Sequence, residues 1–412
     1  MSMIGLLFYC LLFIFLLHRM VRKREVTMSV REIGLAFLLK VGLACLYGYV
    51  FLHYYNGDDT WYWHKLALDE PAKFRNDPSR FYKDFSFIET YEWVGRRFWP
   101  GLSAWIMALE KHIFVRTLAL FNIFSGGNYY INTVFFNFIV FWGHYWLFSL
   151  LVKTFPGKRL PLLLIIFFFP PVLFWLSGIR ADGLLLFFFG LLLWQFNKWL
   201  QQRKGSQLFL CVLAVLGILI FRNVLVLLLA PALLAWLISA RYHRKPLPVF
   251  VGVYALGALL FFASAWISPG LNAPRMIAER QQEFMQLQGT RFHLDTLQPT
   301  VAGFTRVLPQ AAANTFLRPY VWEAKGPLQI MTALQVLCFW LLMLAPFVRK
   351  DKTWKDLPAL PLAWCCLFFG ISLYLFIGYT VPFPGAIVRY KALGELLLLV
   401  LPVLCTRWTP AR

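Results

Sequence analysis

The sequence predicts an all-α polytopic membrane protein with about eleven transmembrane helices and amphipathic interfacial helices in its first outer loop. Of the 412 residues, 60% are hydrophobic and only 14% are charged, which excludes a soluble globular protein and a disordered chain. Apolar runs of roughly 18–22 residues recur from end to end, as transmembrane helices require. The strand alternation of an outer-membrane barrel is absent from the sequence. We therefore expect residues 1–412 to form a single integral membrane domain.

Basic clusters between the apolar runs set the expected topology. They fall at residues 19–31, 153–159, 198–204, 241–245, 349–355 and 407–412. The positive-inside rule places all of them in the cytoplasm, which also explains the net charge of +21 without nucleic acid. The first apolar run precedes its basic cluster, the reverse of a signal peptide, so we expect a retained first helix with its N-terminus outside. The predicted spans are 3–18, 33–53, 132–152, 160–177, 183–200, 207–221, 224–240, 248–268, 328–348, 357–378 and 391–406.

One apolar segment, residues 101–124, is expected to lie in the outer interface instead of crossing the membrane. It carries Glu110, Lys111, His112 and Arg116 near its middle, and each charge at the bilayer centre costs at least about 2.5–3.5 kcal/mol. Only this placement leaves an even number of spans between the first two basic clusters. The outer side then receives loops 54–131, 269–327 and about 379–390, and hairpin tips at 177–182 and 221–223.

Ionisable residues gather at the outer ends of these predicted spans, where the positive-inside rule would leave few basic residues. Arginine binds phosphate bidentately, and a carboxylate can take a proton from an acceptor hydroxyl. Such groups at headgroup depth could hold a lipid-linked phosphate and activate a nucleophile against the sugar attached to it. The candidate catalytic residues are Asp58, Asp59 and Asp182. The candidate ligands of the donor phosphate are Arg180, Arg222, Arg318, Arg389 and Lys391.

The adjacent acids Asp58 and Asp59 need different roles, because consecutive side chains diverge. Asp58 is placed to cap the helix that begins with "TWYWHKLAL", and Gly57 allows a sharp exit from the preceding span. This slightly favours Asp59 as the catalytic base, but the sequence leaves the choice open. Lys40, inside the second span, is expected to extend its ammonium group to the cytoplasmic interface and to have no function.

The pattern resembles the GT-C glycosyltransferases, which are multi-span enzymes that use polyprenyl-phosphate sugars. This superfamily includes the protein-mannosyltransferase-like and lipid A aminoarabinose transferase-like groups. The segments "FFFPPVLFWLSGIRADGLLLFFFGLLL", "LRPYVWEA" and "PGAIVRYK" carry the likeness, which covers roughly residues 40–400. The resemblance implies that Asp58 or Asp59 is the first-loop catalytic acid and that Arg180 and Asp182 occupy the second outer hairpin. It also implies that Arg389 is placed to hold the donor phosphate.

The expected function is transfer of a sugar from undecaprenyl phosphate to a glycan or lipid acceptor at the extracytoplasmic face of the inner (plasma) membrane. We expect membrane lipids as partners, no nucleic acid and no cofactor, although His53 and His64 beside the acids leave a divalent metal open. Two alternatives remain. An O-antigen polymerase or ligase would also use outer arginines, with a diphosphate-linked donor. A flippase or transporter of lipid-linked sugars would instead need ionisable residues near the bilayer midplane.

Overall fold

The computed structural model describes residues 2–267, 272–289, 291–323, 326–351 and 360–408. These residues are almost entirely helical, and the β-pairing found among them is an isolated bridge between Lys350 and Thr406. The chain divides into two compact units. Unit 1 comprises residues 1–153, 173–199 and 204–223, and unit 2 comprises residues 154–172, 200–203 and 224–412. The predicted all-α class is therefore confirmed, and the single integral membrane domain stays a prediction.

Unit 1 is built from long apolar helices and a run of shorter helices in the predicted first outer loop. Ser29 starts the second helix with a reciprocal capping box, because its side chain accepts from Glu32 N and Glu32 accepts from its backbone N–H. Gly126, with φ 62°, ends the helix Phe98–Ser125. The elements are α1 (Ser2–Val21), α2 (Val30–His53), α3 (Asp59–Asn76), α4 (Pro78–Lys83), α5 (Phe87–Trp93), α6 (Phe98–Ser125), α7 (Tyr129–Thr154) and α10 (Ala181–Gln202), with the first part of α11 (Gly205–Arg241).

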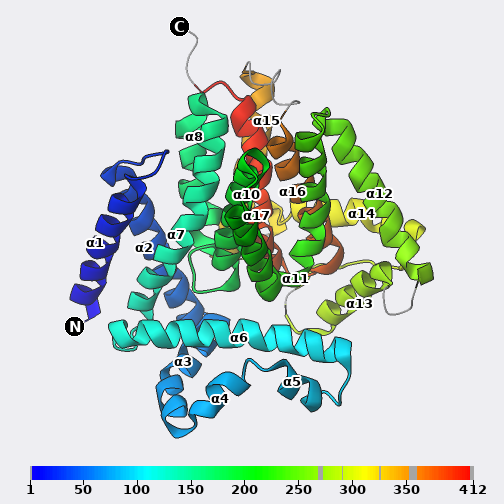
Figure 1. The fold of residues 1–412 in the computed structure, drawn as a ribbon. Coiled ribbons are helices and arrows are strands. Elements are labelled where there is room, and N and C mark those ends of the chain that lie inside the picture. Colours follow the sequence, from blue (N-terminus) through cyan, green and yellow to red (C-terminus); the bar gives the residue numbers. More distant parts are fainter. Residues whose placement is uncertain (1, 268–271, 290, 324–325, 352–359, 409–412) are drawn as a thin grey trace. The chain divides into compact units, whose positions relative to one another are not determined.

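The helix α6 lies crosswise to α2 and α7, at the end of unit 1 where α2 ends and α7 begins (Figure 1). It is 28 residues long, yet it is not among the helices that are apolar enough to cross a membrane. One of its charged side chains, Arg116, pairs at 2.8 Å with Asp84, which follows α4 in the predicted first outer loop. This arrangement agrees with the interfacial placement expected for residues 101–124.

Unit 2 holds the remaining helices, several of which start with proline at the first helical turn, where the missing N–H costs nothing. A small core of Ala278, Leu297 and Val307 packs against Tyr379. The elements are η1 (Pro156–Lys158), α8 (Arg159–Leu163), the π-helical turn η2 (Leu164–Phe168), α9 (Pro170–Trp175, shared with unit 1), the second part of α11, α12 (Pro246–Ile267), α13 (Ala273–Gln286), α14 (Val301–Phe316), η4 (Val321–Glu323), α15 (Pro327–Val348), α16 (Pro361–Thr380) and α17 (Pro384–Cys405).

Eight helices in the described part of the chain are long and apolar enough to cross a membrane, so the predicted count of eleven is not confirmed. Three differences account for the gap. The predicted span 160–177 is divided among α8, η2 and α9. The spans 207–221 and 224–240 form one 37-residue helix, interrupted by non-helical backbone at Arg222 (φ −164°, ψ 84°). The span 391–406 belongs to α17, which begins seven residues earlier and encloses three charged residues.

Some of the predicted boundaries cannot be compared with the structure. The ends of the spans at residues 268 and 357 lie outside the described residues, and so do parts of the basic clusters 349–355 and 407–412. The other spans, including 3–18, 33–53 and 132–152, coincide with α1, α2 and α7 to within a few residues at each end. Such shifts are usual for helix termini.

Two glycines let α7 and α10 approach each other closely within unit 1. A Cβ on Gly143 would lie 2.4 Å from Phe187 Cα, and one on Gly190 would lie 2.2 Å from the carbonyl oxygen of Gly143. Small residues at such crossings are typical of membrane helices, whose association depends on close van der Waals packing.

We therefore expect Gly143→Val to destabilise unit 1, because the backbones of α7 and α10 must separate to admit the side chain. The measurement is the midpoint of thermal unfolding in mild detergent. Gly42→Val is the matched control, since a Cβ at Gly42 in α2 meets nothing within 4 Å. Equal midpoints for the two variants would contradict the close contact.

Candidate functional site

The chain turns sharply between α2 and α3 and presents two carboxylates there. Asn56 and Gly57 have positive φ values of 55° and 92°, and the Gly57 N–H donates to Phe51 O at 2.8 Å. Asp58 is the N-cap of α3, and its Oδ1 accepts from Thr60 N at 3.1 Å. Asp59 is the first residue of that helix. The expected cap at Asp58 and the sharp exit at Gly57 are therefore both present.

The guanidinium of Arg180 joins these two acids to the segment that precedes α10. One terminal nitrogen contacts Asp58 Oδ2, and the other donates to Asp59 Oδ2 at 2.6 Å. The hydroxyl of Tyr47, in α2, lies 3.2 Å from Arg180 Nη1, the nitrogen that contacts Asp58, and 3.2 Å from Asp58 Oδ2. The region from α2 to α3 and the segment before α10, which are more than 100 residues apart in sequence, thus meet at one cation.

Burial distinguishes the two acids. The side chain of Asp58 is 14% exposed and that of Arg180 is 7% exposed, whereas Asp59 is 61% exposed. Asp58 is thus held inside unit 1 by the cation, the tyrosine hydroxyl and the helix cap. Asp59 uses one oxygen for Arg180 and remains accessible. Of the pair, Asp59 is the carboxylate that an incoming substrate can reach.

A second ion pair involves Asp182 and Arg222, whose closest atoms are 3.4 Å apart. Asp182 lies in the first turn of α10 and is buried, whereas Arg222 is at the break in α11 and is 24% exposed. The non-helical backbone at Arg222 replaces the hairpin tip expected at residues 221–223. Five of the eight predicted site residues therefore lie in unit 1, in two ion-paired groups.

A further carboxyl group, Glu110 of α6, belongs to this cluster and was not selected from the sequence. Burial raises its pKa from 4.5 to about 7. The charges of Arg222, Asp182, Asp59 and Arg180 also act on it, the arginines lowering the pKa and the aspartates raising it. A carboxyl that titrates near neutral pH suits a general acid or base. Its sequence signal was an acid near the middle of an otherwise apolar segment.

The other three predicted residues lie in unit 2. Arg318 donates to Asn314 Oδ1 at 3.1 Å, and its Nη2 is 3.4 Å from Glu323. Arg389 lies over the ring of Tyr390, at 4.7 Å from the centroid. Lys391 was expected where the last span enters the lipid, but it lies inside α17, is 2% exposed and donates to Thr315 O at 3.0 Å. The roles of all three as phosphate ligands stay predictions.

Lys40 differs from its expected position. Its side chain does not reach an interface, because it is fully buried in α2. Its Nζ donates to Ser177 Oγ at 2.9 Å and lies 3.4 Å from His144 Nε2. A hydroxyl and an imidazole therefore replace the water that an extended lysine would have sought, and the partners come from distant parts of the sequence.

The histidines beside the acids were the candidates for a metal site. His64 is buried, with Nδ1 3.5 Å from Asn132 Nδ2, and the ring of His53 packs beside Tyr49. In the part of the chain that the structure describes, no three His, Cys, Asp or Glu side chains are grouped so that they could hold a metal ion.

Compared with known proteins, the chain matches no protein-family model, no curated protein and no solved structure.

Removing the Arg180 charge should strongly destabilise unit 1. The Arg180→Gln variant leaves Asp58 buried without its cation, and breaking a buried pair in this way costs about 3–5 kcal/mol. The free energy of unfolding, from denaturant titration in mild detergent, measures the loss.

The control is Arg275→Gln, which breaks the exposed pair with Glu279 and should cost less than about 1 kcal/mol. A double variant, Arg180→Gln with Asp58→Asn, should recover part of the loss, since the carboxylate that lost its cation is no longer charged. A similar small effect in both single variants would show that the Arg180 pair is not structurally important.

Proposed function

We propose that this protein is a membrane glycosyltransferase that moves a sugar from a polyprenyl-phosphate carrier to a glycan or lipid acceptor. The observation that carries the proposal is the accessible carboxylate of Asp59, held by the buried Arg180 in the same cluster as Glu110. The resemblance to GT-C enzymes supports the same activity. The reaction would take place at the extracytoplasmic face of the inner (plasma) membrane, where the acid cluster lies in the expected topology.

In the proposed reaction an acceptor hydroxyl attacks the anomeric carbon of the carrier-linked sugar. Its proton passes to a carboxylate of the cluster, a new glycosidic bond forms, and the bond from the sugar to the phosphate oxygen breaks. The polyprenyl phosphate leaves with the electron pair. Asp59 is the proposed base because it is exposed, and Glu110 is suited to share or relay the proton because its pKa is about 7.

The arginines divide between positioning and phosphate binding in this proposal. Arg180 already contacts Asp58 and Asp59, so it orients the acids and does not hold the phosphate. Arg222 is closer to the role of ligand, since it is partly exposed and its distance to Asp182 is longer. The roles of Arg318 and Arg389, which belong to unit 2, as phosphate ligands stay predictions from the sequence. A bidentate arginine would neutralise the charge that develops on the leaving group.

A second candidate function, a transporter of lipid-linked sugars, is favoured by charges inside α17. Glu395 is 1% exposed and lies eleven residues from the start of a 22-residue helix, thus near its middle. Its Oε2 accepts from Gln335 at 2.7 Å, and Lys391 lies one turn earlier. Ionisable residues at such depth are typical of transport pathways. A transporter would leave the sugar-phosphate bond intact, which separates the two functions chemically.

The Asp59→Asn variant should abolish sugar transfer while the protein remains folded. The amide keeps the shape of the side chain and can still accept from Arg180, but it cannot take up a proton. The assay measures the polyprenyl phosphate that purified protein in lipid releases from a panel of monophosphate-linked sugars. Diphosphate-linked oligosaccharides are tested in parallel, because a polymerase or ligase would use them as donors.

The exposed Asp69→Asn, in the same helix, is the control and should transfer normally. Unchanged transfer by Asp59→Asn would remove Asp59 as the base. Carrier movement across vesicles without cleavage, lost in Glu395→Gln, would favour the transporter.

The pH dependence of transfer should report Glu110. Its pKa is raised to about 7, so the base form is scarce below that pH and predominates above it. Transfer should therefore rise as pH increases through about 7, and Glu110→Gln should lose this rise. Glu89→Gln, in the same outer loop, is the matched control and should keep the profile. An identical profile in the Glu110 variant would show that another group limits the rate.

A further inference from the structure

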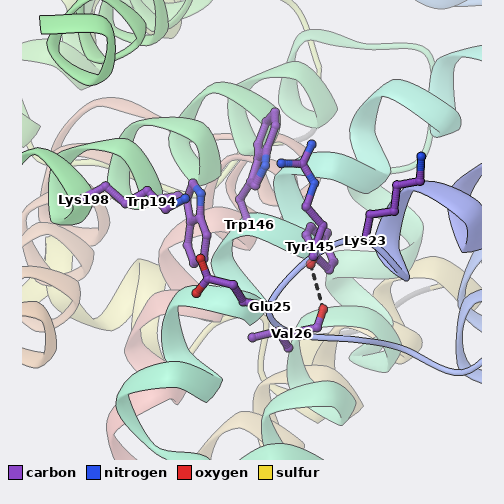
Figure 2. A pocket seen from close by; sticks show the side chains of 8 residues that line it. Lys23, Glu25, Val26, Tyr145, Trp146, Trp194 and Lys198 are labelled. Atoms are coloured by element: carbon purple, nitrogen blue, oxygen red, sulfur yellow. Dashed lines mark hydrogen bonds between the residues drawn. The ribbon is translucent and has the colours of Figure 1, made fainter. Parts of the chain in front are cut away.

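A pocket lined by basic and aromatic side chains lies in unit 1 (Figure 2). It encloses about 140 Å³, roughly ten times what one water molecule requires. The loop between α1 and α2 forms one side, and the C-terminal halves of α7 and α10 form the rest. The lining residues are Lys23, Arg24, Glu25, Val26, Tyr145, Trp146, Trp194 and Lys198.

The pocket has a fixed wall and a positively charged rim. Tyr145 is buried and its hydroxyl donates to Val26 O at 2.7 Å, which ties the loop to α7 (Figure 2). The ammonium groups of Lys153 and Lys198 lie over the ring of Trp194, at 5.0 and 4.6 Å from its centroid. Glu25 contacts Lys153 and so offsets that charge. Lys23, Arg24 and Lys198 leave the lining with an excess of positive charge.

The pocket and the acid cluster lie at opposite ends of the same two helices. The helix α2 begins four residues after Val26 and ends five residues before Asp58, and its 24 residues span about 36 Å. In α7, Tyr129 stacks on Trp61 beside the acids, whereas Tyr145 and Lys153 belong to the pocket end. This separation is about that of the two faces of a bilayer. In the expected topology the pocket is therefore at headgroup depth on the face opposite the acids.

From this geometry we infer that the pocket binds the phosphate of an anionic lipid headgroup. The positive-inside rule explains basic residues at this end, but not a concave pocket beside two ammonium groups that lie over one tryptophan ring. Basic pockets between membrane helices suit anionic headgroups, and tryptophan favours the same depth. In this inference Lys23, Arg24 and Lys198 donate hydrogen bonds to the phosphate, and Trp146 and Trp194 flank the glycerol region of the lipid. The inference is independent of the proposed transfer reaction.

The test compares lipids on the full-length protein in neutral detergent. Phosphatidylglycerol, phosphatidylcholine and inorganic phosphate are titrated separately, and bound ligand is counted by native mass spectrometry. Phosphatidylglycerol should bind more tightly than phosphatidylcholine and should weaken as salt rises. The triple variant Lys23→Gln, Arg24→Gln, Lys198→Gln should lose about a hundredfold in affinity for phosphatidylglycerol.

The matched control removes three exposed basic residues of unit 1 that do not line the pocket: Arg19→Gln, Arg22→Gln and Lys204→Gln. It should retain affinity to within a few-fold. Equal losses in both triples would show a general surface charge and overturn the site, as would equal binding of the two lipids. Tight binding of inorganic phosphate alone would assign the pocket to a soluble anion and overturn the lipid. If the pocket triple does not fold, the single variant Lys198→Gln should show about a fivefold loss.

Discussion

The buried contact between Arg180 and Asp58 holds together the end of unit 1 that carries the candidate site. Arg180 belongs to the segment before α10, Asp58 caps α3, and Tyr47 of α2 reaches both of them. Gly178 makes this possible, because a Cβ there would lie 2.9 Å from the Tyr47 ring. A buried arginine is costly unless its hydrogen bonds are supplied, and here two carboxylates and a hydroxyl supply them. The segments must therefore be correctly placed together before Asp59 has a defined position.

The sequence predicted those parts of the fold that depend on local pattern. Long apolar runs identified α1, α2, α7 and α12, since a helix of such composition has few alternatives. The cap at Asp58 was likewise a local property. The breaks were harder, because the backbone at Arg222 leaves the helical region without a proline or glycine beside it. The pairing of Arg222 with Asp182 involves residues forty apart and has no local sequence signal.

The errors concern charged residues whose partners are remote in sequence. Lys40 was expected to reach the cytoplasmic interface because it lies about two turns from that end of its span, yet its ammonium group contacts Ser177 and His144 inside unit 1. Lys391 was expected at the outer end of the last span, yet it lies inside α17 and donates to Thr315 O of α14. Glu110 was treated as evidence for an interfacial helix and not as a site residue. In each case the three-dimensional fold supplies what the local sequence does not show.

The charges inside α17 can be understood without assuming transport. Lys391 and Glu395 are four residues apart, so they lie on the same face of the helix and their charges offset each other. Lys391 donates to a carbonyl of α14, and Glu395 Oε2 accepts from an amide of α15, whereas Glu395 Oε1 is buried without a hydrogen-bond partner among the described residues. The two bonds lower part of the cost of burying the pair. Asp59 differs in kind, because it is exposed and unit 1 needs only one of its oxygens for Arg180. A group left open in this way suits chemistry on a substrate, whereas the α17 pair is enclosed by its own unit, and this contrast favours the transferase.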